Sequence, residues 1–226
     1  MRKLLYVPII HTQSEMGSVA SAITSRSASL CGEDRWAKHE QTVAKFWENI
    51  ADYFATVETS NLKIYQDGLP ADGELGRTII REVAKRGSKN HQIILNLMEK
   101  GVEIMKTEDP SLLKEEYKYI TGLAQSESAA EKTIAYTKYK LRKGWLTKAR
   151  DKFVAKTIDE TLKDGETGVL FMGSHHNVLP YLSEDIVVQP VKDREKINAY
   201  FKELTSRGDG SKFEQLAEYL VSPCAY

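Results

Sequence analysis

Gly168-Val-Leu-Phe-Met-Gly-Ser-His-His176 is the stretch that decides the fold. Its first five residues carry no polar side chain, which is typical of a strand buried on both faces of a parallel sheet. The stretch Leu4-Leu-Tyr-Val-Pro-Ile-Ile-His11 is built in the same way, an apolar run that stops at a histidine. Ligands bind where the carboxyl ends of parallel strands open onto a crevice. These strand ends therefore mark a candidate site.

Helical patterns separate the apolar runs along the rest of the chain. We expect strands at 3–10, 62–67, 102–106, 169–172 and 186–191, and helices at 34–57, 73–85, 88–100, 128–162, 193–205 and 211–221. Another helix should begin at Asp109-Pro110, with Asp109 as its N-cap, and Ser128 and Glu131 have capping-box spacing. Gly144 is a candidate break in the long helix. Strands that alternate with helices predict a single α/β domain over 1–226, with a largely parallel sheet of about five strands covered by helices.

The charge balance and the cysteine content exclude some classes of protein. The 32 basic and 32 acidic residues cancel, so no global field steers the chain toward nucleic acid or an anionic membrane. Cys31 and Cys224 lie too far apart for a zinc knuckle and suggest no disulfide framework. No apolar run approaches the roughly 20 residues of a membrane span. We expect a cytoplasmic protein that does not bind membranes, and homo-oligomerisation stays open.

Ionisable residues follow four of the five predicted strands. These candidate site residues are His11 and Glu15 after the first strand, Asp67 after the second, Glu108 after the third, and His175 and His176 after the fourth. Adjacent strand residues face opposite ways, so one of the two neighbouring histidines is expected to enter the site. Each candidate also has a structural alternative, as a core, turn or exposed residue. His39 and His91 share helix faces with apolar neighbours and are expected in the core or at its boundary.

The segment Ala149-Arg150-Asp151, the helix after it, and the stretch ending at His176 resemble the closing half of the TraB/GumN/Tiki and ChaN/erythromycin-esterase-like superfamily. Members carry an arginine-containing helix and then an apolar strand that ends in a GxxH motif, here Gly173-Ser-His-His176. Pro8-Ile-Ile-His11 stands where the family has an earlier GxxH-type motif, with proline in place of its glycine. The resemblance implies an α/β fold with both motif histidines in one crevice. Some relatives are metal-dependent peptidases, some look like metal-free esterases, and others bind haem, so the chemistry stays open.

A metal-dependent hydrolase is one hypothesis for this set of residues. The candidate ligands of a divalent zinc, manganese or cobalt ion are His11, Asp67, His175 and His176. Glu15 or Glu108 would accept a proton from the metal-bound water, and Arg150 would stabilise negative charge on the substrate. The alternative for Arg150 is a salt bridge. In the metal-free version, His11 or His176 is the general base and a carboxylate orients its ring. Both versions predict a small-molecule or peptide substrate.

Two further classes of function remain open. The same histidines could hold haem or another small ligand in a non-catalytic protein. The stretch 136–156 is rich in basic residues, and a stripe of it could bind nucleic acid or a phosphorylated ligand: Lys138, Arg142, Trp145, Lys152 and Lys156. Because the net charge is zero and lysines commonly coat solvated helix faces, we expect no nucleic-acid partner.

Overall fold

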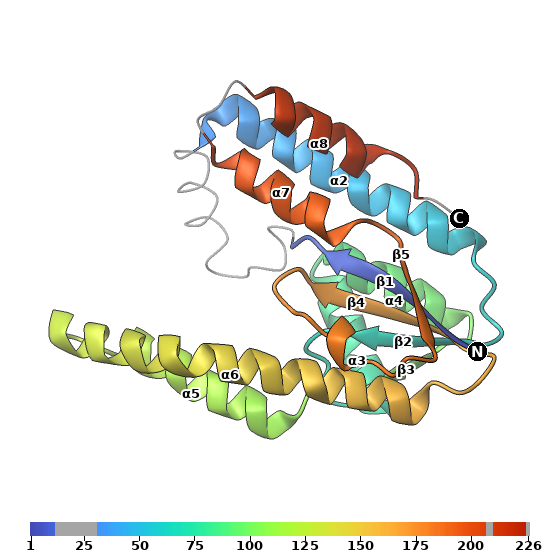
Figure 1. Ribbon diagram of the computed structural model, residues 1–226, viewed down its shortest axis with the longest axis horizontal. Helices are drawn as coiled ribbons and strands as arrows, with labels where there is room; N and C mark the ends of the chain where they lie inside the picture. The colour runs from blue at the N-terminus through green and yellow to red at the C-terminus, as the bar shows by residue number, and fades with distance from the viewer. Residues whose placement is uncertain (12–30, 207–209, 225–226) are drawn as a thin grey trace.

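Five parallel strands form the central sheet, in the order β3-β2-β4-β1-β5 (Figure 1). The computed structural model describes residues 1–11, 31–206 and 210–224. The strands are β1 (Arg2–Ile9), β2 (Leu62–Gln66), β3 (Glu103–Met105), β4 (Thr167–Gly173) and β5 (Ile186–Pro190). β1 and β4 are neighbours, paired from Lys3 and Thr167 to Ile9 and Gly173. The predicted α/β class with a parallel sheet is confirmed.

Alternating side chains of the strands enter two separate apolar clusters. Leu5 and Val7 belong to the larger cluster on one face, whereas Leu4 and Tyr6 belong to the smaller cluster on the other. Successive strand residues point to opposite faces, so a strand covered on both sides needs apolar residues at nearly every position. This explains why β1 and β4 read as continuous apolar runs.

Helices cover both faces of the sheet (Figure 1). The larger cluster is closed by α2 (Glu33–Thr56), α3 (Gly73–Lys85), α4 (Lys89–Glu99), α7 (Arg194–Leu204) and α8 (Ser211–Val221). On the opposite face lie the carboxyl half of α6 (Ala129–Thr161) and the short η3 (Leu179–Tyr181). The next described helix after β1 is α2, on one face, and the element that follows β4 is η3, on the other. Connections that diverge from neighbouring parallel strands open a crevice between the strand ends, which is where this fold class binds ligands.

A helical hairpin made of α5 (Pro110–Ala124) and α6 extends beyond the sheet (Figure 1). The predicted caps are present, since the Asp109 carboxylate accepts from the Ser111 amide and Ser128 forms a capping box with Glu131. The break expected at Gly144 is wrong, because α6 is continuous through it. A glycine inside a helix costs about 1 kcal/mol, which the hydrogen bonds of a 33-residue helix can absorb. No residue from 110 to 145 is buried.

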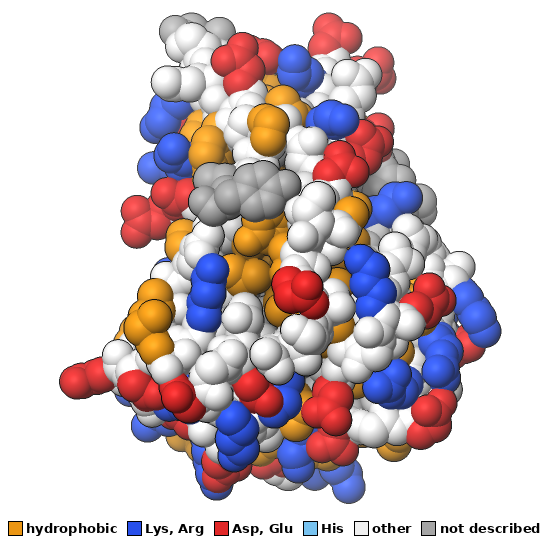
Figure 2. All heavy atoms as spheres, turned by 90° about the vertical axis from the view of Figure 1, so that its right-hand side faces the viewer, with side chains coloured by type: hydrophobic (Ala, Val, Ile, Leu, Met, Phe, Trp, Pro, Cys, Tyr) orange, Lys and Arg blue, Asp and Glu red, His pale blue; other side chains and the backbone are white. Residues whose placement is uncertain are grey.

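The surface carries both signs of charge side by side. On the face shown in Figure 2, acidic and basic side chains are interspersed with apolar ones, as the balanced charge of the sequence predicts. In the described ranges, no helix has both the length and the apolar character that crossing a bilayer requires.

The buried His39 of α2 makes the stability of the fold depend on pH. Its Nδ1 lies 3.0 Å from the Tyr200 hydroxyl, and burial lowers the pKa of His39 to about 4. Because the pKa of this histidine is lower in the folded state, its contribution to stability is complete at pH values above the unfolded pKa of about 6.5. The contribution is lost as the pH falls toward 4. The lost contribution is about 3 kcal/mol at most. We expect His39→Gln to remove this component, so that urea unfolding of the variant depends less steeply on pH between 7 and 4. Parallel pH profiles for the variant and the wild type would contradict it.

Candidate functional site

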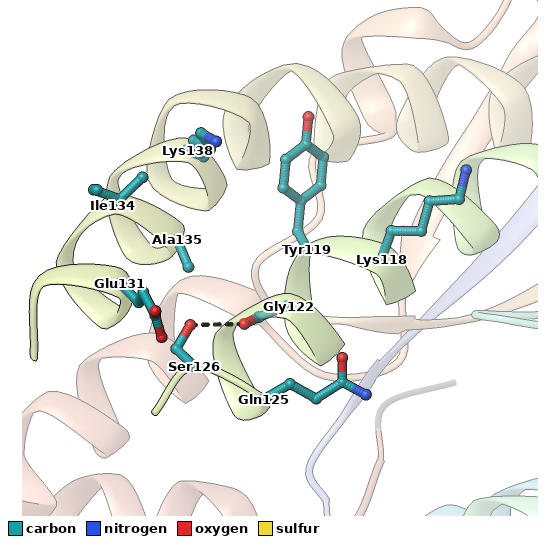
Figure 3. Close-up of a pocket in the computed structure, with 9 residues that line it drawn as sticks. All are labelled: Lys118, Tyr119, Gly122, Gln125, Ser126, Glu131, Ile134, Ala135 and Lys138. Carbon is teal, nitrogen blue, oxygen red and sulfur yellow. Dashed lines mark hydrogen bonds between the residues drawn. The ribbon is translucent and has the colours of Figure 1, made fainter. Parts of the chain in front are cut away.

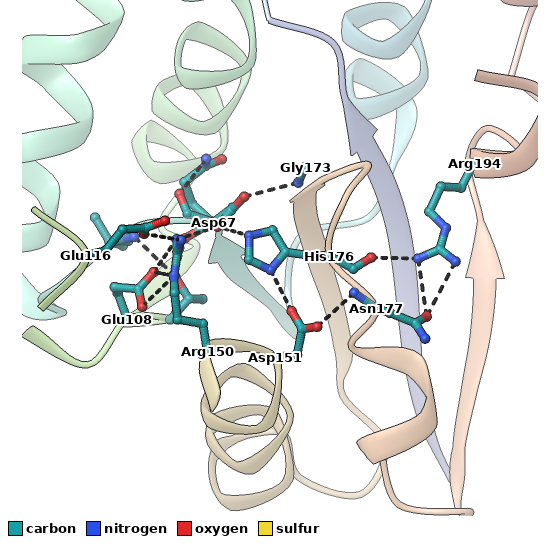
Figure 4. A network of polar contacts seen from close by, with 12 residues as sticks. Asp67, Glu108, Glu116, Arg150, Asp151, Gly173, His176, Asn177 and Arg194 are labelled. Atoms are coloured by element: carbon teal, nitrogen blue, oxygen red, sulfur yellow. Dashed lines mark hydrogen bonds and ion pairs between the residues drawn. The ribbon is translucent and has the colours of Figure 1, made fainter. Parts of the chain in front are cut away.

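A buried histidine and aspartate pair forms the centre of the candidate site (Figure 4). His176 follows β4 and is 1% exposed, and Asp151 projects from α6 and is 4% exposed. The Nδ1 atom of His176 lies 2.5 Å from Asp151 Oδ1, while Asp151 Oδ2 accepts from the backbone amide of Asn177. An ionised carboxylate can only accept, so Nδ1 is the protonated nitrogen and Nε2 carries the lone pair in a neutral ring. The pair therefore fixes both the orientation and the tautomer of His176.

Two buried polar atoms in the described ranges lack a hydrogen-bond partner, and both are at this site. They are Nε2 of His176 and the hydroxyl of Tyr6 on β1. Burial raises the pKa of the Tyr6 phenol, an effect that the nearby positive Arg194 opposes and that negative Asp67 and Asp151 reinforce. An unpaired buried polar group costs about 1–3 kcal/mol, and such groups in native proteins commonly have a functional role. The two atoms are therefore candidates for a functional role.

Arg150 of α6 contacts three carboxylates, on the side of the His176 ring away from Asp151 (Figure 4). Its guanidinium contacts Glu108 at 2.6–3.0 Å, Glu116 at 3.0 Å and Asp67 at 3.5 Å. Glu108 is 1% exposed, and burial raises the pKa of its carboxyl even though Arg150 opposes the shift. Nε, Nη1 and Nη2 of Arg150 all meet a carboxylate. This geometry favours the salt-bridge alternative for Arg150 over contact with a substrate oxygen.

Asp67 links the arginine cluster to His176. Its Oδ1 lies 3.7 Å from Nε2 of His176, and its Oδ2 accepts from the backbone amide of Gly173 at 3.1 Å. A Cβ at position 173 would lie 3.0 Å from that same oxygen and 3.2 Å from the His175 ring. Glycine at this strand end therefore permits the close approach of Asp67.

The turn after His176 is held by Arg194, which opens α7. Its guanidinium donates to the backbone carbonyl of His176 at 2.6 Å and reaches the Asn177 side chain (Figure 4). A fixed backbone here leaves the His176 ring little freedom to change its direction.

The other predicted histidines lie at the rim of the site. His175 is exposed, and its ring centroid lies 4.2 Å from that of His176. Burial lowers the pKa of His175, and the neighbouring His176 acts in the same direction. His11 is exposed at the end of β1. Glu15 lies outside the described residues.

Two cavities meet at His11. One, of about 390 Å³, lies between the ends of β1 and β4 and helices α2 and α7, and His175 also lines it. The other, of about 270 Å³, lies beside Asp67 at the end of β2, under α3 and α4. The predicted strand-end residues thus share one edge of the sheet. Of these residues, Asp67, Glu108 and His176 are in the network with Arg150, whereas His11 and His175 are at the cavity walls.

The metal centre at the strand ends stays a prediction. No group of three or more His, Cys, Asp or Glu side chains in the described part of the chain is arranged to hold a metal ion. A cation between Asp67 and His176 would also lie close to the Arg150 guanidinium, which already contacts Asp67. Like charges at this distance repel. We therefore derive no step through a metal.

The hairpin shows a separate cavity and the predicted basic stripe. Figure 3 shows a cavity of about 420 Å³ near the outer end of α5 and α6, with the Ser126 hydroxyl donating to the Gly122 carbonyl. The described residues that line it include no histidine. In the stripe, Arg142 pairs with Glu115 and lies over the Trp145 ring at 3.7 Å. Contacts within the chain thus neutralise part of the positive charge of the stripe.

Sequence reasoning missed several residues of the network. Asp151, Tyr6 and Arg194 were not predicted as site residues, although Asp151 directly follows Arg150. One sequence feature could have identified Tyr6, since its hydroxyl lies inside an otherwise apolar strand. Arg194 had none, because its position at the start of α7 resembles that of any helix-end cation.

Comparisons of the chain with protein-family models, with curated proteins and with solved structures find no match. The resemblance to the TraB/GumN/Tiki and ChaN/erythromycin-esterase-like superfamily stays a prediction.

Proposed function

We propose that this protein is a hydrolase that cleaves a carboxylic ester or amide with His176 as general base and without a metal. One observation carries the proposal: a buried imidazole whose Nδ1 is held at 2.5 Å by Asp151 while its Nε2 has no hydrogen-bond partner. In histidine-based hydrolases, a carboxylate holds the ring so that the other nitrogen can take a proton.

The proposed reaction needs no group beyond water and the residues of the network. Nε2 of His176 takes a proton from water as the water oxygen attacks the substrate carbonyl carbon. The Tyr6 hydroxyl donates to the carbonyl oxygen, which becomes negative in the tetrahedral intermediate. The imidazolium then returns its proton to the leaving oxygen or nitrogen as the bond to carbon breaks. The products are the carboxylic acid and the alcohol or amine.

Asp67 and Asp151 support this cycle through their negative charge. Both lie near the imidazole, at 3.7 Å and 2.5 Å from its nitrogens, so they stabilise the imidazolium that forms during attack. Arg150 keeps Asp67 in place through their 3.5 Å contact. Because Nε2 is buried, side chains around it must move before a substrate reaches it, and the exposed His175 ring, which packs against His176, is the candidate for this movement.

A substrate screen tests the proposal. Protein without a His-tag is assayed with p-nitrophenyl esters, peptide p-nitroanilides and p-nitrophenyl phosphate, each with a chelator and with added zinc, manganese or cobalt. We expect turnover of an ester or an anilide that the chelator does not reduce and that Asp151→Asn loses. Turnover that requires added metal would contradict the metal-free mechanism. Equal rates for the wild type and Asp151→Asn on every substrate would contradict the hydrolase.

A further inference from the structure

The cavity between the ends of β1 and β4 has a lining that selects for a particular chemistry. Its volume of about 390 Å³ lies within the range of small-molecule sites. Its apolar lining residues include Trp36 of α2, Phe201 and Leu204 of α7, and Ile9 and Ile10 at the end of β1. None of the described residues that line it is Asp, Glu, Lys or Arg.

Two of the histidines in the lining are neutral as well. His39 has a pKa of about 4 because it is buried, and burial also lowers the pKa of His175. Both rings are therefore uncharged at pH 7. A charged group that entered this cavity would lose its hydration without gaining an opposite charge from the described lining, which is costly. An apolar group would lose only its unfavourable contact with water.

One wall of the cavity comes from the residues that directly precede the candidate catalytic histidine. Ser174 and His175 form part of its wall, and the His175 ring packs on that of His176. A chain or ring held here would place an attached carbonyl at the strand ends. The cavity is thus positioned to hold the part of a substrate next to the bond that is cleaved.

We propose that this cavity binds the uncharged, apolar acyl group of the substrate, so that the enzyme acts on esters or amides of apolar carboxylic acids. The inference rests on the proposed hydrolase. Each methylene buried in the cavity should raise kcat/KM about fourfold, until the cavity is filled.

The first test measures binding and does not depend on activity. N-phenyl-naphthylamine is a neutral fluorescent probe, and anilinonaphthalene sulfonate has the same rings with one negative charge. We expect the neutral probe to bind at least tenfold more tightly. Thr205 lines the rim of the cavity and is exposed, so a substitution there should leave the fold intact. Thr205→Trp should weaken binding of the neutral probe at least tenfold, and Thr205→Ser, which adds no bulk, less than twofold.

The second test uses p-nitrophenyl esters from acetate to octanoate. We expect kcat/KM to rise with chain length in the wild type, and Thr205→Trp to reduce the value for octanoate far more than for acetate. Hydrolysis that is independent of chain length, together with equal binding of the two probes, would overturn the acyl pocket and leave the hydrolase standing. Tight binding of the neutral probe by a protein with no hydrolysis would overturn the hydrolase, and with it the acyl role of the cavity, although the selectivity for apolar ligands would stand.

Discussion

His176→Ala is expected to lower kcat/KM for the best substrate about 10³-fold. A positioned general base contributes about 10²- to 10⁴-fold, and the Asp151 carboxylate positions the His176 ring for this role. Asp151→Asn should cause a loss of similar size for a different reason. An amide at this position donates to Nδ1 instead of accepting from it, which moves the ring proton to Nε2 and removes the lone pair that takes the proton from water. Initial rates at several substrate concentrations measure both effects.

Matched variants separate a chemical loss from a folding defect. Asp159→Asn makes the same change two turns along α6, at a carboxylate that pairs with Arg2, and should leave kcat/KM within twofold of the wild type. His176→Gln keeps most of the side-chain volume and should be as inactive as the alanine variant. His175→Ala should lose less than tenfold, since its ring covers the base without acting as one. A His176→Ala protein that keeps full activity would remove the central assignment.

The strands and the caps could be predicted from the sequence because their causes are local. A strand covered on both faces must be apolar throughout, and Val169 to Met172 shows this without any knowledge of the fold. Asp109 before a proline at the first helical position is likewise a local signal. Asp67 and His176 could also be predicted to lie in one site, because parallel strands have their carboxyl ends at the same edge of the sheet.

The rest of the network could not be predicted because packing alone brings it together. Asp151 and His176 are 25 residues apart, and the register of α6 on the sheet decides which carboxylate reaches the ring. Arg150, the neighbour of Asp151, points instead to carboxylates after β2 and β3 and on α5. The sequence shows which residue types lie at the strand ends. It does not show how the helix beside them is rotated about its axis, and this rotation decides which side chains face the sheet.

Arg150→Met is expected to lower the stability of the protein, and this is the second large effect. This change leaves Glu108, which is 1% exposed, without the cation that contacts it at 2.6 Å. Removing one partner of a buried ion pair costs about 3–5 kcal/mol, because the remaining charge stays buried. We expect a fall of that order in the free energy of unfolding at pH 7, measured in urea. The double variant Arg150→Met/Glu108→Gln should recover much of it, since the most deeply buried of the three carboxylates that contact Arg150 then carries no charge.

The pH dependence of Arg150→Met separates an ion-pair role from a substrate-binding role. Burial raises the pKa of Glu108, so its protonated form favours the folded state; that contribution is present below the unfolded pKa and is lost as the pH rises. Without Arg150 the pKa of Glu108 should rise further. The penalty should therefore be smallest near pH 4.5 and should grow toward pH 7.

Arg81→Met, which removes the exposed partner of Glu74, should show no measurable change at either pH. If Arg150 instead served to bind substrate, its replacement would raise KM and leave the unfolding free energy unchanged at both pH values.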